Sequence, residues 1–196
     1  LIETEALAKM LNQPNVRLID AIDSASYQRA HIPGAVNVFY LDLAKIDARK
    51  KNGYPLSEIE AEKVFGEAGI DASTQVVVYD GGEGPFASGV WFVLDFFGHK
   101  NVKVLNGGFR KWLKEGRAVT QETAAVEKKK FSPKARPEKV VSRAWLEKNL
   151  RSKDIVVVDN RSFNEFIGKD VRPGASRGGH IPGAVHLEWT KFSDKL

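Results

Sequence analysis

A six-residue phrase that occurs twice constrains the fold of this chain more than any other feature. His-Ile-Pro-Gly-Ala-Val stands at residues 31–36 and again at 180–185. Each copy follows a short apolar run that ends in an aspartate, Asp20 in the first case and Asp159 in the second. Proline disfavours helical backbone at the residue before it, and glycine permits a tight turn. The chain therefore contains two related units, each with a strand, a short helix and a turn in the same order.

The part of the chain after the first copy alternates between predicted helices and strands. Ser57 opens a capping-box pattern that predicts a helix to about Ala68. The apolar run at 76–79 predicts a strand covered on both faces, followed by a buried helix over 86–97 and another strand over 102–105. This alternation indicates an α/β fold with a mainly parallel central sheet flanked by helices.

Helix starts and aromatic residues give further local expectations. Thr4, Ser24 and Ser142 are expected to cap three helices, because their hydroxyls can accept from backbone N–H groups that lack a partner at a helix start. The large aromatic side chains are expected to pack in cores or between units rather than to bind a ligand. They are Tyr79, Trp91, Trp112, Trp145 and Trp189.

The rhythm of helices and strands stops over one stretch. Residues 118–139 are rich in Thr, Glu, Lys and Pro, which is typical of a linker. We therefore expect a complete unit over 1–117, a linker over 118–139, and the first part of a second, incomplete unit over 140–196. The second copy also carries an insertion near 168–178, just before its repeated phrase.

Composition excludes several classes of site and partner. The chain has no cysteine, which excludes disulfides and thiolate metal sites; two of its four histidines belong to the repeated phrase, so we expect no metal and no cofactor. No apolar run reaches the about 18 residues of a membrane helix, so we expect a cytoplasmic protein with no membrane partner. The net charge of +5 comes with no nucleic-acid motif and favours a small anionic ligand.

The residues around the two copies carry a specific resemblance. They are Asp20, His31–Ala35, Val76–Asp80, Gly98–His99 and Val104–Trp112, together with the second copy of the phrase. This combination resembles the tandem-domain rhodanese family of thiosulfate and 3-mercaptopyruvate sulfurtransferases. The resemblance covers essentially the whole chain, as one complete domain and the first part of a second.

The resemblance implies a catalytically silent first domain and a second domain with a nucleophilic cysteine in a loop after its central strand. That thiolate would take a sulfane sulfur from a small anionic donor, hold it as a persulfide, and pass it to a thiol or cyanide acceptor. In the first domain Asp80 occupies the position of the cysteine, and an aspartate cannot carry a transferable sulfur. We expect the complete protein to be a monomeric enzyme, and these 196 residues, truncated before the cysteine loop, to be inactive alone.

Charged residues after the second apolar run are candidates for contact with the donor. The resemblance places Asp159, Arg161 and Glu165 beside the substrate, and Arg161 is the best candidate to bind an anion. The alternative for Arg161 is a salt bridge to Asp159. Many family members carry an arginine where Glu165 stands, as a partner for the substrate carboxylate, and its absence here argues against a preference for mercaptopyruvate. Arg172 and Arg177 in the insertion could line the same cleft or be solvated.

Other interpretations of the same residues stay open. His31 and His180 are expected to hydrogen-bond to backbone and pin their turns rather than to act in catalysis. Residues 82–87 match the pattern G-x-G-x-x-A, which is found in dinucleotide-binding loops, but the acidic residue that such a site needs is missing from the next strand. The main alternative to an enzyme is a non-catalytic rhodanese-like binding or regulatory module, because the chain has no cysteine.

Overall fold

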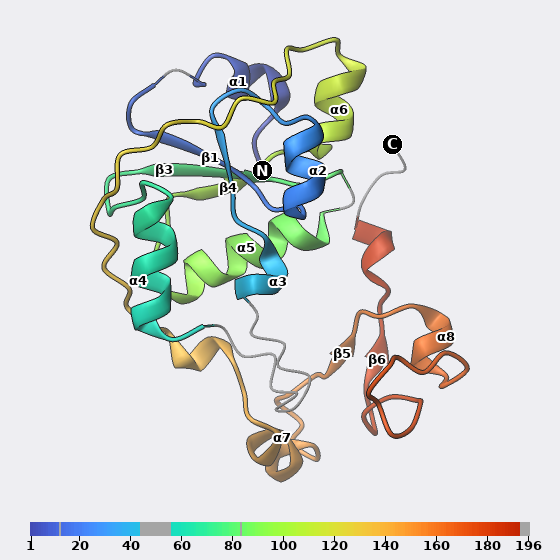
Figure 1. Ribbon diagram of the computed structural model, residues 1–196. Coiled ribbons are helices and arrows are strands. Elements are labelled where there is room, and N and C mark those ends of the chain that lie inside the picture. Colours follow the sequence, from blue (N-terminus) through green and yellow to red (C-terminus); the bar gives the residue numbers. More distant parts are fainter. Residues whose placement is uncertain (12, 44–55, 83, 193–196) are drawn as a thin grey trace. The chain divides into compact units, whose positions relative to one another are not determined.

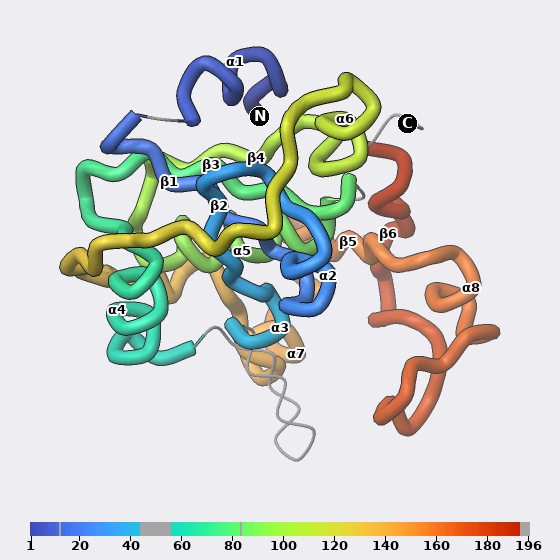
Figure 2. Tube along the Cα trace, turned by 45° about the horizontal axis from the view of Figure 1, so that its top comes forward, coloured from blue at the N-terminus to red at the C-terminus, as the bar shows by residue number. Residues whose placement is uncertain are grey.

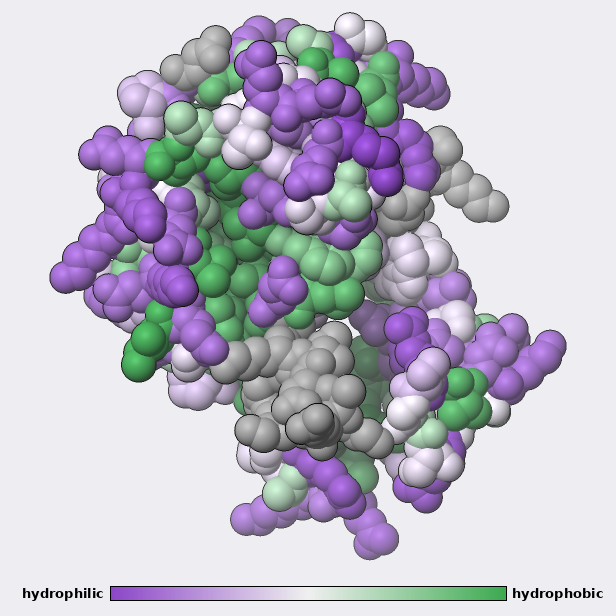
Figure 3. Space-filling model, viewed as in Figure 1, coloured by the Kyte–Doolittle hydropathy of each residue, from purple (hydrophilic) through white to green (hydrophobic). Residues whose placement is uncertain are grey.

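The chain folds into two compact units. The computed structural model describes residues 1–11, 13–43, 56–82 and 84–192. Unit 1 spans Leu1–Pro137 and unit 2 spans Glu138–Leu196. Figure 3 shows hydrophobic side chains on the surface of both units.

Unit 1 is built on a four-stranded parallel sheet. Its strands are β1 (Val16–Asp20), β2 (Ala35–Asn37), β3 (Gln75–Tyr79) and β4 (Val102–Val104), in the order β2-β1-β3-β4. All three strand pairs are parallel. Helices cover both faces of the sheet (Figure 1), which confirms the predicted α/β architecture.

Each face of the sheet has its own helices and its own core. One face is covered by α1 (Thr4–Ala8), α2 (Ser24–Arg29) and α6 (Gly108–Lys114), the other by α3 (Tyr40–Leu43), α4 (Glu58–Glu67) and α5 (Pro85–Phe96), as Figures 1 and 2 show. Because side chains alternate along a strand, Val76 and Val78 of β3 pack in the α5 core, and Val77 and Tyr79 pack in the α1 core. The strand is buried on both faces, as its continuous apolar run predicted.

Local capping patterns were correct for α4 and wrong for two other helices. Ser57 and Glu60 form the predicted capping box. Thr4 does not cap α1, because its hydroxyl donates to the carboxylate of Glu115 instead. The cap of α2 is Asp23 rather than Ser24, since the Asp23 side chain accepts from the N–H of Ser26.

Residues 118–136, which we call the strap, run over the surface of unit 1. The strap pairs with the first repeated turn, where the backbones of His31 and Thr120 exchange two hydrogen bonds of 2.9 Å. Further along, the N–H of Lys129 donates to the carbonyl of Gly66, and Phe131 is buried in the α5 core. The segment expected to be a linker thus has most of its length fixed to unit 1.

Two of the five large aromatic residues lie in the core. Tyr79 and Trp112 are buried as expected. Trp91, Trp145 and Trp189 are each more than a third exposed, so these three are not core residues, and their packing between units stays a prediction.

Unit 2 begins like a second copy of unit 1. The short helix η1 (Pro137–Lys139) spans the boundary between the units. Unit 2 then contains α7 (Arg143–Asn149), β5 (Val158–Asp159), α8 (Phe163–Phe166), β6 (Val185–His186) and η2 (Trp189–Phe192). Ser142 caps α7 as predicted, by accepting from the N–H of Trp145. Strands β5 and β6 pair in parallel with Val158 opposite Val185, the register that Ile19 and Val36 have in unit 1.

Candidate functional site

The two aspartates that end the apolar runs mark corresponding strand ends. Asp20 is the last residue of β1 and Asp159 is the last residue of β5. In parallel α/β sheets, ligands bind outside the carboxyl ends of the strands, where loops from neighbouring strands meet. Each unit has a cavity at this position.

The cavity of unit 1 lies between β1 and the loop that follows β3. Its volume is about 290 Å3, and it is lined by Asp20, Ile22, Ser26, Arg29, Ala30, Asp80, Gly81 and Phe109. Asp20 and Asp80 come together here because β1 and β3 are neighbours in the sheet. Both carboxylates are almost completely buried.

The carboxylate of Asp80 fills a ring of backbone N–H groups at the start of α5. Its Oδ1 accepts from the N–H of Gly82 at 2.9 Å and of Gly84 at 3.1 Å, and its Oδ2 accepts from Ala87 at 3.1 Å. Helix N-termini and successive backbone N–H groups bind anions. We call these three N–H groups the amide cradle. The anion that occupies it belongs to the chain itself, so the loop is not free to bind the phosphates of a dinucleotide.

Asp20 belongs to a second buried network beside the cradle. Its Oδ1 accepts from the N–H of Ile22 at 3.0 Å, and the hydroxyl of Tyr79 also donates to its carboxylate. The same Tyr79 oxygen accepts from the N–H of Ile32 at 3.1 Å. Burial raises the pKa of Asp20 and the pKa of Tyr79 above their ordinary values. The network connects the strand end to the repeated turn.

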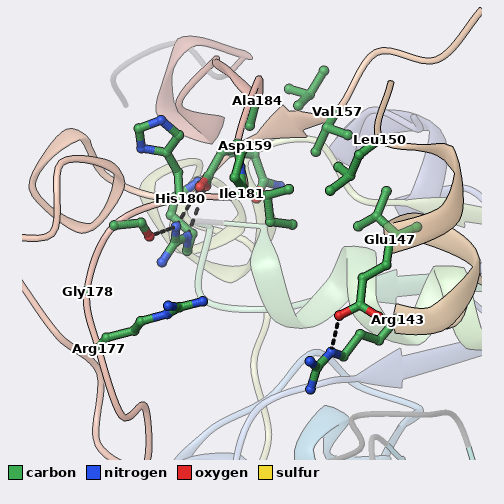
Figure 4. Close-up of a pocket in the computed structure, with 16 residues that line it drawn as sticks. Arg143, Glu147, Leu150, Val157, Asp159, Arg177, Gly178, His180, Ile181 and Ala184 are labelled. Atoms are coloured by element: carbon green, nitrogen blue, oxygen red, sulfur yellow. Dashed lines mark hydrogen bonds and ion pairs between the residues drawn. The ribbon is translucent and has the colours of Figure 1, made fainter. Parts of the chain in front are cut away.

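The pocket of unit 2 is larger and carries more positive charge (Figure 4). Its volume is about 710 Å3. Its polar lining residues include Arg143, Glu147, Asp159, Arg161 and Arg177. Two of the three predicted substrate-binding residues, Asp159 and Arg161, therefore line one pocket.

Arg161 is held by Asp159 through two hydrogen bonds. Its Nε donates to Oδ1 at 2.9 Å, its Nη2 donates to Oδ2 at 2.5 Å, and Nη2 also donates to the carbonyl of Gly179 at 2.9 Å. The contact lowers the pKa of Asp159 and raises the pKa of Arg161. Because the pair is close to neutral, Arg161 alone offers little net charge to an anion.

Arg177 adds to the pocket a positive charge that the Arg161–Asp159 pair does not provide. It lines the same pocket, and Figure 4 draws its side chain among the lining residues, with no dashed line to a carboxylate. The third arginine of the lining, Arg143, pairs with Glu147 at 2.7 Å. Among the described residues, no ion pair or side-chain hydrogen bond joins Arg177 to a carboxylate.

Glu165 lies outside the pocket. It caps α8 together with Ser162, and its carboxylate accepts from Nε of Arg172 at 2.5 Å. This contact lowers the pKa of Glu165. Glu165 and Arg172 thus pair with each other and do not line the pocket that Asp159 and Arg161 line.

The two repeated histidines pin their turns in the same way. Nδ1 of His31 donates to the carbonyl of Tyr27, and Nδ1 of His180 donates to that of Phe166, each at 2.8 Å. Each imidazole also stacks on the ring of that same residue, with ring centroids 3.8 Å apart. Nε2 of His31 additionally faces the carbonyl of Glu122 in the strap. These contacts agree with the predicted structural role.

Sequence reasoning missed the polar residues that α7 gives to the pocket. Arg143 and Glu147 stand four residues apart, a spacing that places them on one face of a helix. That spacing was visible in the sequence, but its proximity to Asp159 was not. Within the described residues, no group of His, Asp and Glu is arranged to hold a metal ion, and no helix is long and apolar enough to cross a membrane.

Comparison with known proteins adds family evidence to this geometry. A model of the rhodanese-like domain matches residues 3–115 and 142–196. Thiosulfate sulfurtransferase from Rattus norvegicus is 33% identical over 208 residues, which cover 98% of this chain and 70% of the rat protein. Thiosulfate sulfurtransferase from Azotobacter vinelandii is 34% identical over 196 residues, which cover 99% of this chain and 70% of that protein.

A solved structure agrees with the fold. The crystal structure of SseA from Escherichia coli, among the 3-mercaptopyruvate sulfotransferases, superposes with a TM-score of 0.84 at 24% identity; the match covers 100% of this chain and 77% of SseA. The parallel sheet, the repeated turn and the loop after β3 define a tandem α/β protein of the rhodanese type. The chain belongs to the rhodanese-like domain family, and the two relatives named above are thiosulfate sulfurtransferases.

Proposed function

We propose that this chain is part of a sulfurtransferase that moves the sulfane sulfur of thiosulfate, or the thiol sulfur of 3-mercaptopyruvate, to a thiol or cyanide acceptor. The sulfur would be carried as a persulfide on a cysteine outside these 196 residues, because the chain contains none. The observation that carries the proposal is the pocket of unit 2, where Arg161 and Arg177 lie at the carboxyl end of β5.

The two arginines would share the work of binding the anionic donor. Arg177 provides the net positive charge, and Arg161 provides oriented N–H groups whose position Asp159 fixes. Charge-assisted hydrogen bonds from guanidinium groups are short and strong, which suits a sulfonate or carboxylate. Glu165 would act indirectly, because its ion pair with Arg172 holds that arginine outside the pocket.

The test separates donor binding from turnover. Thiosulfate binding to the 196-residue chain is measured by calorimetry at low ionic strength, with Arg177→Gln as the variant and Arg151→Gln, an exposed arginine outside the pocket, as the matched control. We expect Arg177→Gln to weaken binding about 10-fold, about 1.4 kcal/mol, and the control to leave it unchanged. Equal effects of the two substitutions would contradict the proposed donor site.

The second candidate function is a non-catalytic rhodanese-like module. The observation that favours it is the Asp80 carboxylate, which closes the amide cradle of unit 1 to any other anion. The thiosulfate titration distinguishes the two functions: a module without a donor site would show no saturable heat. A thiosulfate:cyanide assay on the pure chain is expected to show no turnover, and measurable turnover would refute the requirement for an external cysteine.

A further inference from the structure

Arg17 places a charge near the start of a central strand. It is the second residue of β1, which lies between β2 and β3 in the sheet of unit 1. When the two units are aligned on Asp20 and Asp159, the counterpart of Arg17 is Val156. Central strands of parallel sheets are normally apolar on both faces. The strand therefore does not need an arginine at this position in order to form.

The guanidinium of Arg17 has no partner within the described residues. Its Nε is buried and makes no hydrogen bond, and no ion pair of the described residues includes it. Burial lowers the pKa of Arg17, and no charged neighbour contributes to that shift. Taking a charge out of water without a partner is costly. An anion bound beside Arg17 would reduce this cost.

Arg17 lines a cavity of about 220 Å3 at the amino end of β1. Strand β2 begins at Ala35, which lies opposite Leu18, so the edge of β1 before Leu18 has no neighbour in β2. The strap borders this gap with Ala124 and Ala125. We call this space the Arg17 cavity. It lies at the opposite end of β1 from Asp20 and from the cavity that Asp20 lines.

Three segments bring hydrogen-bond donors to the Arg17 cavity. They are the guanidinium of Arg17, the side-chain amide of Gln13 in the loop before β1, and the backbone N–H groups of Ala124 and Ala125 in the strap. Among the described residues, neither of these backbone N–H groups has an acceptor. None of the described lining residues is Asp or Glu. Donors from three directions, with no carboxylate among them, suit a small oxyanion.

We propose that the Arg17 cavity binds a small oxyanion of the sulfate or phosphate type. The guanidinium would donate charge-assisted hydrogen bonds to two of its oxygens, and Gln13 and the strap would donate to the others. The bound anion would join β1 to the strap and slow the opening of residues 124–126. The site is separate from the donor pocket of unit 2 and does not depend on the proposed sulfur transfer.

The test is a titration of the 15N-labelled 196-residue chain with sodium sulfate and, separately, with sodium phosphate. Sodium chloride keeps the ionic strength constant. We expect saturable shifts of the Ala124 and Ala125 amide signals and slower hydrogen exchange of these amides. Arg17→Gln should weaken the binding about 10-fold or more, because it removes hydrogen bonds from a charged donor. Gln13→Ala changes an exposed side chain, so it keeps the test valid if Arg17→Gln does not fold, and it should weaken the binding about 3-fold.

Two control variants separate this site from other attraction of anions. Arg177→Gln changes the pocket of unit 2, and Lys130→Gln removes an exposed charge of the strap. Both should leave the affinity measured at Ala124 and Ala125 unchanged. Shifts that do not saturate with either anion, shifts confined to unit 2, or equal losses of affinity in Arg17→Gln and Lys130→Gln would overturn the proposal.

Discussion

Replacing Asp80 with alanine should destabilise unit 1 strongly, because the carboxylate satisfies all three N–H groups of the amide cradle. Hydrogen bonds to a charged group contribute about 1.5–3 kcal/mol each, so three of them amount to roughly 5–9 kcal/mol. Removing a buried charge recovers several kcal/mol of desolvation cost. We therefore expect a net loss of about 3 kcal/mol, which corresponds to a fall of about 10 °C in Tm for a unit of this size.

The measurement is urea unfolding of the 196-residue chain at pH 7, followed by near-ultraviolet circular dichroism. Asp80→Asn keeps one acceptor oxygen and should cost less than Asp80→Ala. Asp154→Ala removes an exposed aspartate and should change the free energy of unfolding by less than about 0.5 kcal/mol. A loss below about 1 kcal/mol for Asp80→Ala would refute the idea that the carboxylate holds the loop.

The same variant tests whether the cradle is an anion site that the chain fills itself. Without the carboxylate, the three N–H groups can donate hydrogen bonds to sulfate or thiosulfate from solution. At an anion concentration ten times Kd, binding restores about 1.4 kcal/mol of stability to Asp80→Ala. The unsubstituted chain should gain nothing through this site. Equal stabilisation of both proteins would show that the anions act elsewhere.

Three further predictions concern unit 1. Gly108→Ala should lower Tm more than Gly116→Ala does in thermal unfolding: both glycines have positive φ, but an added Cβ at Gly108 would lie 2.6 Å from the carbonyl of Asp80, whereas Gly116 faces open space. Burial lowers the pKa of His99 below 6.5, so stability should fall as pH drops through 6.5 and below, and His99→Gln should flatten that slope in urea unfolding at several pH values. Burial raises the pKa of Asp20 above 3.8, so its protonated carboxyl stabilises the folded chain at low pH, and this stabilisation is lost as the pH rises above 3.8. Asp20→Asn should therefore raise the free energy of unfolding at pH 7. A variant less stable than the unsubstituted chain at that pH would contradict this.

Much of the fold follows from short-range features of the sequence. The repeated phrase, the apolar run of β3 and the capping box at Ser57 each act over a few residues, and each formed as predicted. The cap expected at Thr4 is missing because of a tertiary contact, and the cap expected at Ser24 is missing because of a local one. Glu115, distant in sequence, captures the Thr4 hydroxyl, and Asp23 stands in the N-cap position because α2 begins at Ser24 itself.

The site shows the same division. The sequence by itself determined the family resemblance and the absence of cysteine. It also offered the salt bridge between Asp159 and Arg161, because these side chains are only two residues apart. Only the tertiary structure decided that Asp80 fills an amide cradle, that Glu165 lies outside the pocket, and that the strap is fixed to unit 1. The first two contacts lie within a few residues but depend on the path of the loop after β3 and of the insertion, and the third joins segments far apart in sequence. Residue patterns along the chain do not specify these paths.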